Sequence, residues 1–235
     1  MPTWHEFVLD SVQTAIFTPE QSAFATGPAV ATILRQFSDE FDGDIQSLPL
    51  PADVPPEIPR VVLQSGDGKR RLSIGPARFD SNRNADGTSS LPEIVRDCSR
   101  VQEFYVRDRG VRVGRVGLVI RRACPIENPA EALVQRFCNE ASQREPFNRS
   151  ATFEIHNHKE YLPRRDGIDY TINSWVRCKC ARLSDDDSPA IVVEQDLNTM
   201  ATDLNLRRFG PDRLHAFFEM AAEEADAILR IYFPE

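Results

Sequence analysis

The pattern of hydrophobic and polar residues predicts the same order of elements twice along this chain. Residues 1–110 and residues 111–235 each indicate a strand, a helix, three short strands and a second helix. Each such element has one apolar side to bury, and a sheet with a helical layer on one face satisfies all of them. The pattern predicts an α+β fold of two similar β-α-β-β-β-α halves. We expect antiparallel pairing, helices packed on one side, and one compact unit.

The first half contains one amphipathic helix and one hairpin that are easily recognised. After Gly27, apolar residues recur at spacings of three and four positions, which is typical of a helix with one buried face. Glycines at positions 66 and 68 lie between two apolar runs and indicate a hairpin turn. In order, the predicted elements are a strand at 7–17, a helix from Gly27, a stiff proline-rich connector at 48–59, a hairpin at 61–74, a strand at 77–83 and a helix from Pro92.

The second half begins with the clearest strand pattern in the chain and ends with its clearest helix. Residues 111–120 are rich in valine and isoleucine. Asn128 and Pro129 suit the residue before a helix and its first position. The predicted elements are a strand at 111–120, a helix from Pro129, strands at 151–158, 170–183 and 190–197, and a helix over 211–232.

Composition is that of an ordinary water-exposed globular chain, with 41% hydrophobic and 27% charged residues. No apolar run approaches the roughly 20 residues that span a bilayer. The N-terminal residues lack the basic region of a signal peptide. The five cysteines fall in or at the ends of predicted elements, as reduced thiols do. We therefore expect a cytoplasmic protein without membrane contact.

Charge is distributed in three sectors. Residues 1–59 hold nine acids and one base, residues 60–125 hold 14 bases and seven acids, and residues 126–235 hold 13 bases and 20 acids. A basic sector of this kind favours one of two interpretations. It forms an exposed surface for an acidic partner, or its bases pair with the acidic flanks of the same molecule.

One stretch resembles a known group of proteins. Residues 61–65 (VVLQS), Gly68 and residues 72–79 (LSIGPARF) are similar to a signature of a sporadically distributed family of bacterial proteins of about this length with no assigned function. Those proteins also begin with a strand, a helix and a proline-bearing connector. The resemblance implies no catalytic residue. The patchy distribution of that family suggests systems that move horizontally between bacteria, such as antiviral defence or toxin-related systems.

The best candidate for catalytic chemistry is a run of polar residues in the predicted strand 151–158. On a strand, Glu154, His156 and His158 project from the same face. Two imidazoles and a carboxylate are ligands for zinc or iron. Neighbours on one strand face are about 6.6 Å apart along the chain, so both rings would have to converge on one ion. The alternative is the exposed polar face of a half-buried strand, which the spacing favours.

Arginines are frequent between residues 107 and 122, which raises the question of nucleic-acid binding. Arg112 and Arg122 share one side of the predicted strand, whereas Arg115 and Arg121 share the other. A nucleic-acid groove needs its bases on one surface with aromatic residues among them. Contact with nucleic acid is therefore a lesser alternative to contact with protein.

These patterns favour a non-enzymatic bacterial protein that binds another macromolecule, as a subunit of a defence or toxin-related system. The expected partner is another protein, and no cofactor is expected. Two alternatives stay open: a metal-assisted hydrolase that uses Glu154, His156 and His158, and a small-ligand-binding module with a pocket between sheet and helices. The sequence does not indicate the oligomeric state. The candidate partner-binding residues are Phe104, Arg112, Arg122, Trp175 and Arg177.

Overall fold

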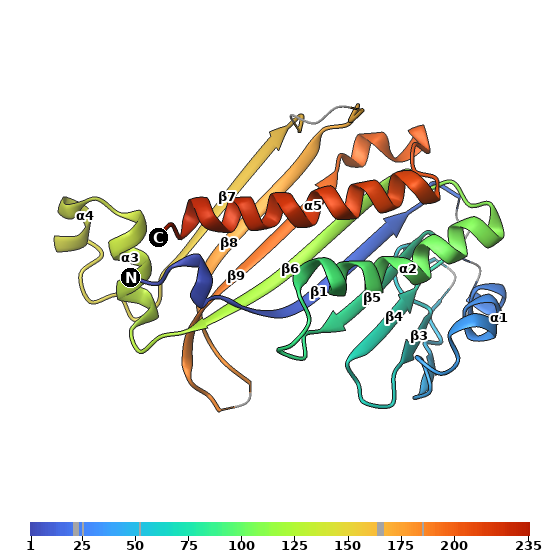
Figure 1. Cartoon of the computed structure of the whole chain (residues 1–235), viewed down its shortest axis with the longest axis horizontal. Helices are drawn as coiled ribbons and strands as arrows, with labels where there is room; N and C mark the ends of the chain where they lie inside the picture. Colours follow the sequence, from blue (N-terminus) through green and yellow to red (C-terminus); the bar gives the residue numbers. More distant parts are fainter. Residues whose placement is uncertain (21–23, 25, 52, 164–166, 185) are drawn as a thin grey trace.

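The fold is built on one antiparallel sheet. The computed structural model describes residues 1–20, 24, 26–51, 53–163, 167–184 and 186–235. Its sheet has nine strands in the order β2-β3-β4-β5-β1-β6-β9-β8-β7 (Figure 1). The strands are β1 (Val8–Phe17), β2 (Ile45–Ser47), β3 (Val61–Gln64), β4 (Arg70–Ile74), β5 (Arg78–Asn84), β6 (Arg115–Pro125), β7 (Glu154–Tyr161), β8 (Ile172–Arg182) and β9 (Pro189–Thr199).

Helices cover one face of this sheet. The two long helices, α2 and α5, pack against each other across the middle strands, while α1 lies at one end of the sheet and α3 and α4 at the other (Figure 1). This arrangement confirms the predicted α+β fold. None of the helices in the described part of the chain combines the length and apolarity needed to cross a bilayer. The helices are α1 (Thr26–Phe37), α2 (Leu91–Arg109), α3 (Pro129–Phe137), α4 (Glu140–Arg144) and α5 (Pro211–Tyr232), with 3-10 turns η1 (Trp4–Glu6) and η2 (Ala201–Leu206).

The two halves have the same strand order when followed outward from the centre. β1 and β6 are neighbours, and they are flanked by β5, β4 and β3 on one side and by β9, β8 and β7 on the other. β1 pairs with β6 from Val8 to Phe17, so the sheet continues without a break from one half to the other. The expected boundary between the halves falls at Gly110, which has a left-handed conformation (φ 63°) and ends α2.

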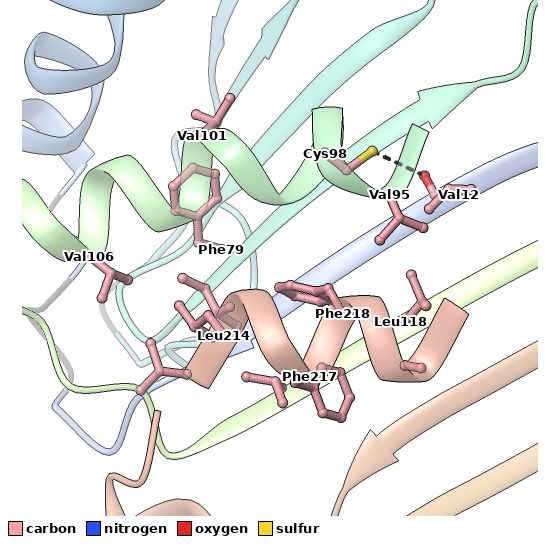
Figure 2. Packing of buried hydrophobic residues seen from close by; sticks show 14 of the residues in the cluster. Val12, Phe79, Val95, Cys98, Val101, Val106, Leu118, Leu214, Phe217 and Phe218 are labelled. Carbon is pink, nitrogen blue, oxygen red and sulfur yellow. Dashed lines mark hydrogen bonds between the residues drawn. The ribbon is translucent and has the colours of Figure 1, made fainter. Parts of the chain in front are cut away.

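The main core lies between the central strands and the two long helices (Figure 2). Val12, Phe79 and Leu118 project from β1, β5 and β6 toward the helices, where α5 contributes Phe217 and Phe218. All five side chains are buried. Burying one such side chain contributes about 1.5–3 kcal/mol, so this layer fixes the helical side of the sheet. The opposite side carries the residues that alternate with these along each strand.

Two strands start three or four residues later than the sequence pattern indicates. The strand expected from residue 111 begins at Arg115, because Val113 instead forms an isolated bridge to Phe209. The strand expected from residue 151 begins at Glu154, after a turn that ends near Ser150. Neither shift changes which face a side chain occupies, because the alternation along each strand is kept.

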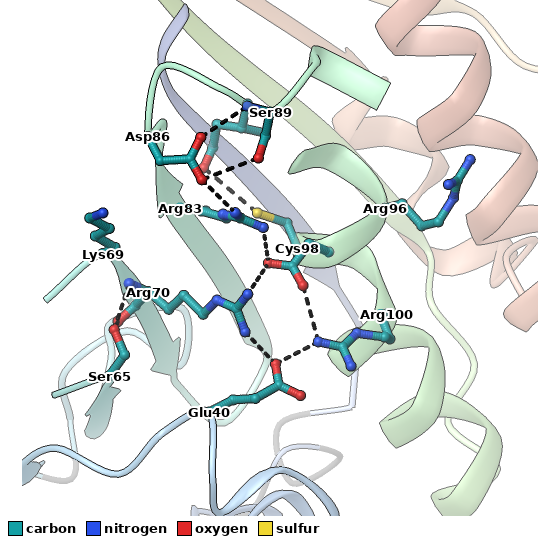
Figure 3. Close-up of polar contacts among 12 residues, drawn as sticks. Glu40, Ser65, Lys69, Arg70, Arg83, Asp86, Ser89, Arg96, Cys98 and Arg100 are labelled. Carbon is teal, nitrogen blue, oxygen red and sulfur yellow. Dashed lines mark hydrogen bonds and ion pairs between the residues drawn. The ribbon is translucent and has the colours of Figure 1, made fainter. Parts of the chain in front are cut away.

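Several bases of the basic sector are paired within the molecule. Asp97 on α2 accepts ion pairs from Arg70 of β4 (3.0 Å) and Arg83 of β5 (2.5 Å), and Glu40 accepts from Arg70 (2.6 Å) and Arg100 (2.5 Å) (Figure 3). Glu40 belongs to the acidic N-terminal sector. Two further pairs join bases of this sector to acids of the N-terminal and C-terminal sectors: Arg121–Asp10 and Arg122–Asp226. Of the two interpretations of the charge pattern, internal pairing thus accounts for these bases.

Candidate partner-binding face

The face of the sheet opposite the helices, here called the open face, presents polar and aromatic side chains. At its centre, side chains of β5, β1, β6 and β9 contact one another through cation–π contacts, hydrogen bonds and an ion pair. The guanidinium groups of Arg78 and Arg115 each lie 4.9 Å from the centre of the Phe17 ring. Arg78 pairs with Asp80 at 2.8 Å, and Arg115 donates to Asn198 at 2.8 Å. Every charge at this centre therefore already has a partner.

Burial shapes the electrostatics of this centre. Desolvation raises the pKa of Asp80, against the opposing effect of Arg78. It likewise raises the pKa of Asp196 on β9, and it lowers the pKa of Arg115. The ionised forms are retained by pairing rather than by water. The charged groups at the centre of the open face are thus held by contacts with one another.

The β7–β8 end of the open face is different, because its side chains are half exposed. Trp175 is 43% exposed, and its indole stacks on the His158 ring with 4.1 Å between centroids and an 8° angle between planes. Arg177 lies between Glu154 (3.2 Å) and Glu194 (3.7 Å). A hollow of about 320 Å³ opens here, lined by Trp175, Val176, Arg177, Glu194 and Asp196. We call Glu154, His156, His158, Trp175, Arg177 and Glu194 the Trp175 patch.

The geometry does not support the metal-assisted alternative. His156 Nε2 lies 2.5 Å from Glu154 Oε1, but His158 Nε2 lies 2.6 Å from the Asn173 amide oxygen. The two rings therefore do not converge, as the spacing along a strand led us to expect. Within the described ranges, no group of three or more His, Cys, Asp or Glu side chains could hold a metal ion. These three residues form the polar surface of a half-buried strand.

The predicted partner-binding residues are distributed over three parts of the molecule. Trp175 and Arg177 lie together on the open face. Arg112 is exposed just before β6. Phe104 lies on α2, where it is half buried and packs edge-on against Phe37 at 5.3 Å. Including Arg122 in a partner-binding surface was wrong. It is 4% exposed and pairs with Asp226 and Gln195 on the helical side, because it alternates with Arg121 and so shares the inward side with Ile120.

A second hollow on the open face was not found from the sequence. It measures about 560 Å³ and lies over β4 and β5, beside the end of the proline-rich connector at residues 57–59. Two cations in its wall, Lys69 and Arg71, have no ion-pair partner among the described residues. Asn82, which lies opposite Arg71 in the β4–β5 register, adds an amide. Arg71 and Ser73 alternate with the apolar Leu72 and Ile74, and this alternation is the signal that places Arg71 on the open face.

Comparisons with known proteins add little to this geometry. No protein-family model matches the sequence, and no curated protein matches it. Among solved structures, the chain is similar to the di-domain ARO/CYC StfQ from the steffimycin biosynthetic pathway, with 10% identity over 95% of this chain and 97% of that chain. The TM-score of that superposition is 0.21. A score this low supports no inference about fold or function.

Proposed function

We propose that this chain is a non-enzymatic interaction protein that holds another protein on the Trp175 patch. The observation that carries the proposal is the His158–Trp175 stack beside Arg177 on an otherwise uncovered sheet face. Tryptophan and arginine dominate the binding energy of protein interfaces. A stacked indole is already ordered before binding, so little side-chain entropy is lost when a partner covers it.

The charge of the patch favours a protein partner over a nucleic acid. Arg177 on β8 lies between two carboxylates, Glu154 on β7 and Glu194 on β9, so the charges alternate in sign from one strand to the next. A nucleic acid would require bases of one sign along its phosphates. A partner with its own mixed charges complements this pattern, and the half-exposed pairs can exchange partners at low desolvation cost.

The cellular role we propose is that of a subunit in a bacterial defence or toxin-related system. This part of the proposal rests on the similarity of the hairpin at residues 61–79 to a sporadically distributed bacterial family. Its support is therefore an analogy, separate from the geometry of the Trp175 patch.

Photo-crosslinking followed by reconstitution tests the binding proposal. A photoreactive residue at Lys179, on the same face of β8 as Arg177, should capture a protein, whereas the same residue at Arg107 on α2 should not. The captured protein is then purified and titrated by calorimetry. We expect Trp175→Ala to weaken the purified complex about 10-fold or more. Arg107→Ala serves as the matched control and should leave affinity unchanged. Equal affinity of Trp175→Ala and the parent would refute the proposal.

A second candidate function is suggested by the hollow over β4 and β5. Lys69 and Arg71 in its wall have no ion-pair partner in the described part of the chain, and the amides of Gln64 and Asn82 line the same wall. Two carboxylates also belong to the wall: Asp80, which is paired with Arg78, and Glu57. The two unpaired cations favour a small anionic ligand. Citrate, inorganic phosphate and ATP are suitable probes in thermal-shift assays. At least one should raise the Tm of the parent and of Arg107→Ala but not of Arg71→Glu. A Tm that none of the three probes raises would eliminate this candidate.

A further inference from the structure

The two edges of the sheet differ in how well they are protected. At one edge, β2 has three residues and runs directly into the proline-rich connector, whose first residue, Leu48, donates its backbone N–H to Arg60 at 2.7 Å. Short strands and prolines are the usual means of blocking an edge. At the other edge, β7 has eight residues and pairs with β8 along its whole length without a register shift. β7 is thus a long, regular edge.

The backbone groups that β7 leaves free can be assigned from its ladder. Cys180 donates its backbone N–H to the Phe153 carbonyl oxygen, so residues 153 and 180 form a hydrogen-bonded pair. Because such pairs alternate in antiparallel ladders, every second residue from Ile155 to Tyr161 bonds to β8. The N–H and C=O groups of Glu154, His156, His158 and Glu160 therefore point away from the sheet.

Apolar side chains are exposed on the helical side of this edge. A hollow of about 210 Å³ lies between β7 and α5, and Tyr161, Ile228 and Ile231 are part of its wall. Ile231 is 74% exposed, and Leu162, directly after β7, is 63% exposed. The edge itself is held in place, because Asn157 donates to the Tyr232 hydroxyl at 2.6 Å and Tyr161 donates to Glu224 at 3.0 Å.

We propose that two copies of this chain pair antiparallel through β7, with His158 opposite His158 of the second copy, and so join their sheets into one. The two-fold axis is perpendicular to the sheet, which keeps both helical layers on the same side. In this register His156 lies opposite Glu160, and Ile155 lies opposite Tyr161 at the rim of the apolar hollow. Polar pairs that can hydrogen-bond and apolar pairs in such positions stabilise a sheet. This inference does not depend on the proposed function.

The neighbouring registers are disfavoured by like charges. With Asn157 opposite itself, Glu154 would lie opposite Glu160 twice across the interface. With Lys159 opposite itself, two ammonium groups would be adjacent. Registers shifted by a single residue would set outward backbone groups against inward ones, so no ladder forms. The register centred on His156 also avoids these conflicts, but it pairs only residues 154–158 of the strand, whereas the register centred on His158 pairs residues 155–161 and is favoured by its longer ladder.

Light scattering combined with size-exclusion chromatography tests the dimer. At about 100 µM protein, the parent should elute with twice the mass of a 26.6 kDa chain. His156→Pro removes an outward N–H without breaking a bond to β8, so it should give a folded monomer with an unchanged circular-dichroism spectrum. Trp175→Ala should remain dimeric. A monomeric parent at this concentration would refute the proposal. Pairing of β7 with a strand of another protein would then be the alternative.

Engineered disulfides test the register. In the proposed pairing, residue 158 lies about 5.5 Å (Cα–Cα) from residue 158 of the second copy, within the range that a disulfide bridges. Residue 156 lies roughly 14 Å from its own counterpart, judged from the rise along the strands. His158→Cys should therefore form a disulfide-linked dimer under mild oxidation, mapped by mass spectrometry, and His156→Cys should not. Equal cross-linking of the two variants would show that the register is wrong.

Discussion

Replacing Gly114 with alanine should lower the stability of the protein by about 3 kcal/mol or more. A Cβ atom at this position would overlap the carbonyl oxygen of Leu204 and lie 2.9 Å from its Cα. These are backbone atoms, so no side-chain rotation relieves the overlap. Gly114 also donates its N–H to the Phe17 carbonyl oxygen at 2.8 Å, and the neighbouring Val113 bridges to Phe209. Urea unfolding followed by circular dichroism measures the loss.

The matched control for this variant is Gly27→Ala. Gly27 lies in α1, and a Cβ there meets nothing within 4 Å. Alanine there should change stability by no more than about 1 kcal/mol, because the backbone freedom that glycine loses on folding is offset by crowding of the new Cβ against the following Pro28. If Gly114→Ala unfolds at the same urea concentration as the parent, residues 200–206 do not pack against the start of β6 as described.

Replacing Asp226 with alanine should destabilise the protein by about 2–3 kcal/mol. Asp226 on α5 pairs with Arg122 on β6, which is buried and otherwise bonds to Gln195. Without Asp226, a guanidinium would stay buried with one neutral partner. Burial already lowers the pKa of Arg122, an effect that Asp226 opposes. The expected loss is smaller than that for a fully buried pair, because the Asp226 side chain is 41% exposed and water can approach.

A double variant separates the loss of the pair from the loss of packing. Arg122→Met in the Asp226→Ala background removes the buried charge and keeps an apolar side chain of similar length. It should regain part of the stability, because well-packed apolar residues often replace a buried ion pair without loss. The gain is incomplete because the buried Gln195 amide oxygen loses its donor, Arg122. Chemical unfolding of both variants and the parent provides the comparison. A double variant less stable than Asp226→Ala would contradict this account.

The elements of the fold follow from local physical chemistry. The apolar stripe of residues 211–232 required a helix with one buried face, and α5 has these bounds. The helix expected from Pro129 begins there, although the Asn128 side chain makes no cap hydrogen bond. The helix expected from Pro92 begins one residue earlier, at Leu91, because Ser90 and Glu93 form a capping box whose spacing is readable in the sequence.

Only part of the candidate site could be predicted from the sequence. Alternation along β8 placed Trp175 and Arg177 on one face, and the structure keeps them together. Alternation alone did not say which face of the strand beginning near residue 111 the helices would cover. Arg122 therefore could not be assigned to the interior until α5 brought Asp226 beside it. Phe104 likewise has a partner, Phe37, from a distant helix.

The sequence by itself determined the type and order of the main elements, because helical and strand periodicities depend on residues only a few positions apart. The short elements β2 and α4 were not predicted. The sequence also determined which residues share a side of each strand. Only the tertiary structure decided which side is buried, which bases are paired and which edge is left free. Those properties arise from contacts between residues far apart in the chain, such as Arg122 with Asp226 and Arg70 with Glu40. For the same reason, the open face and the edge at β7 became visible only once the sheet was assembled.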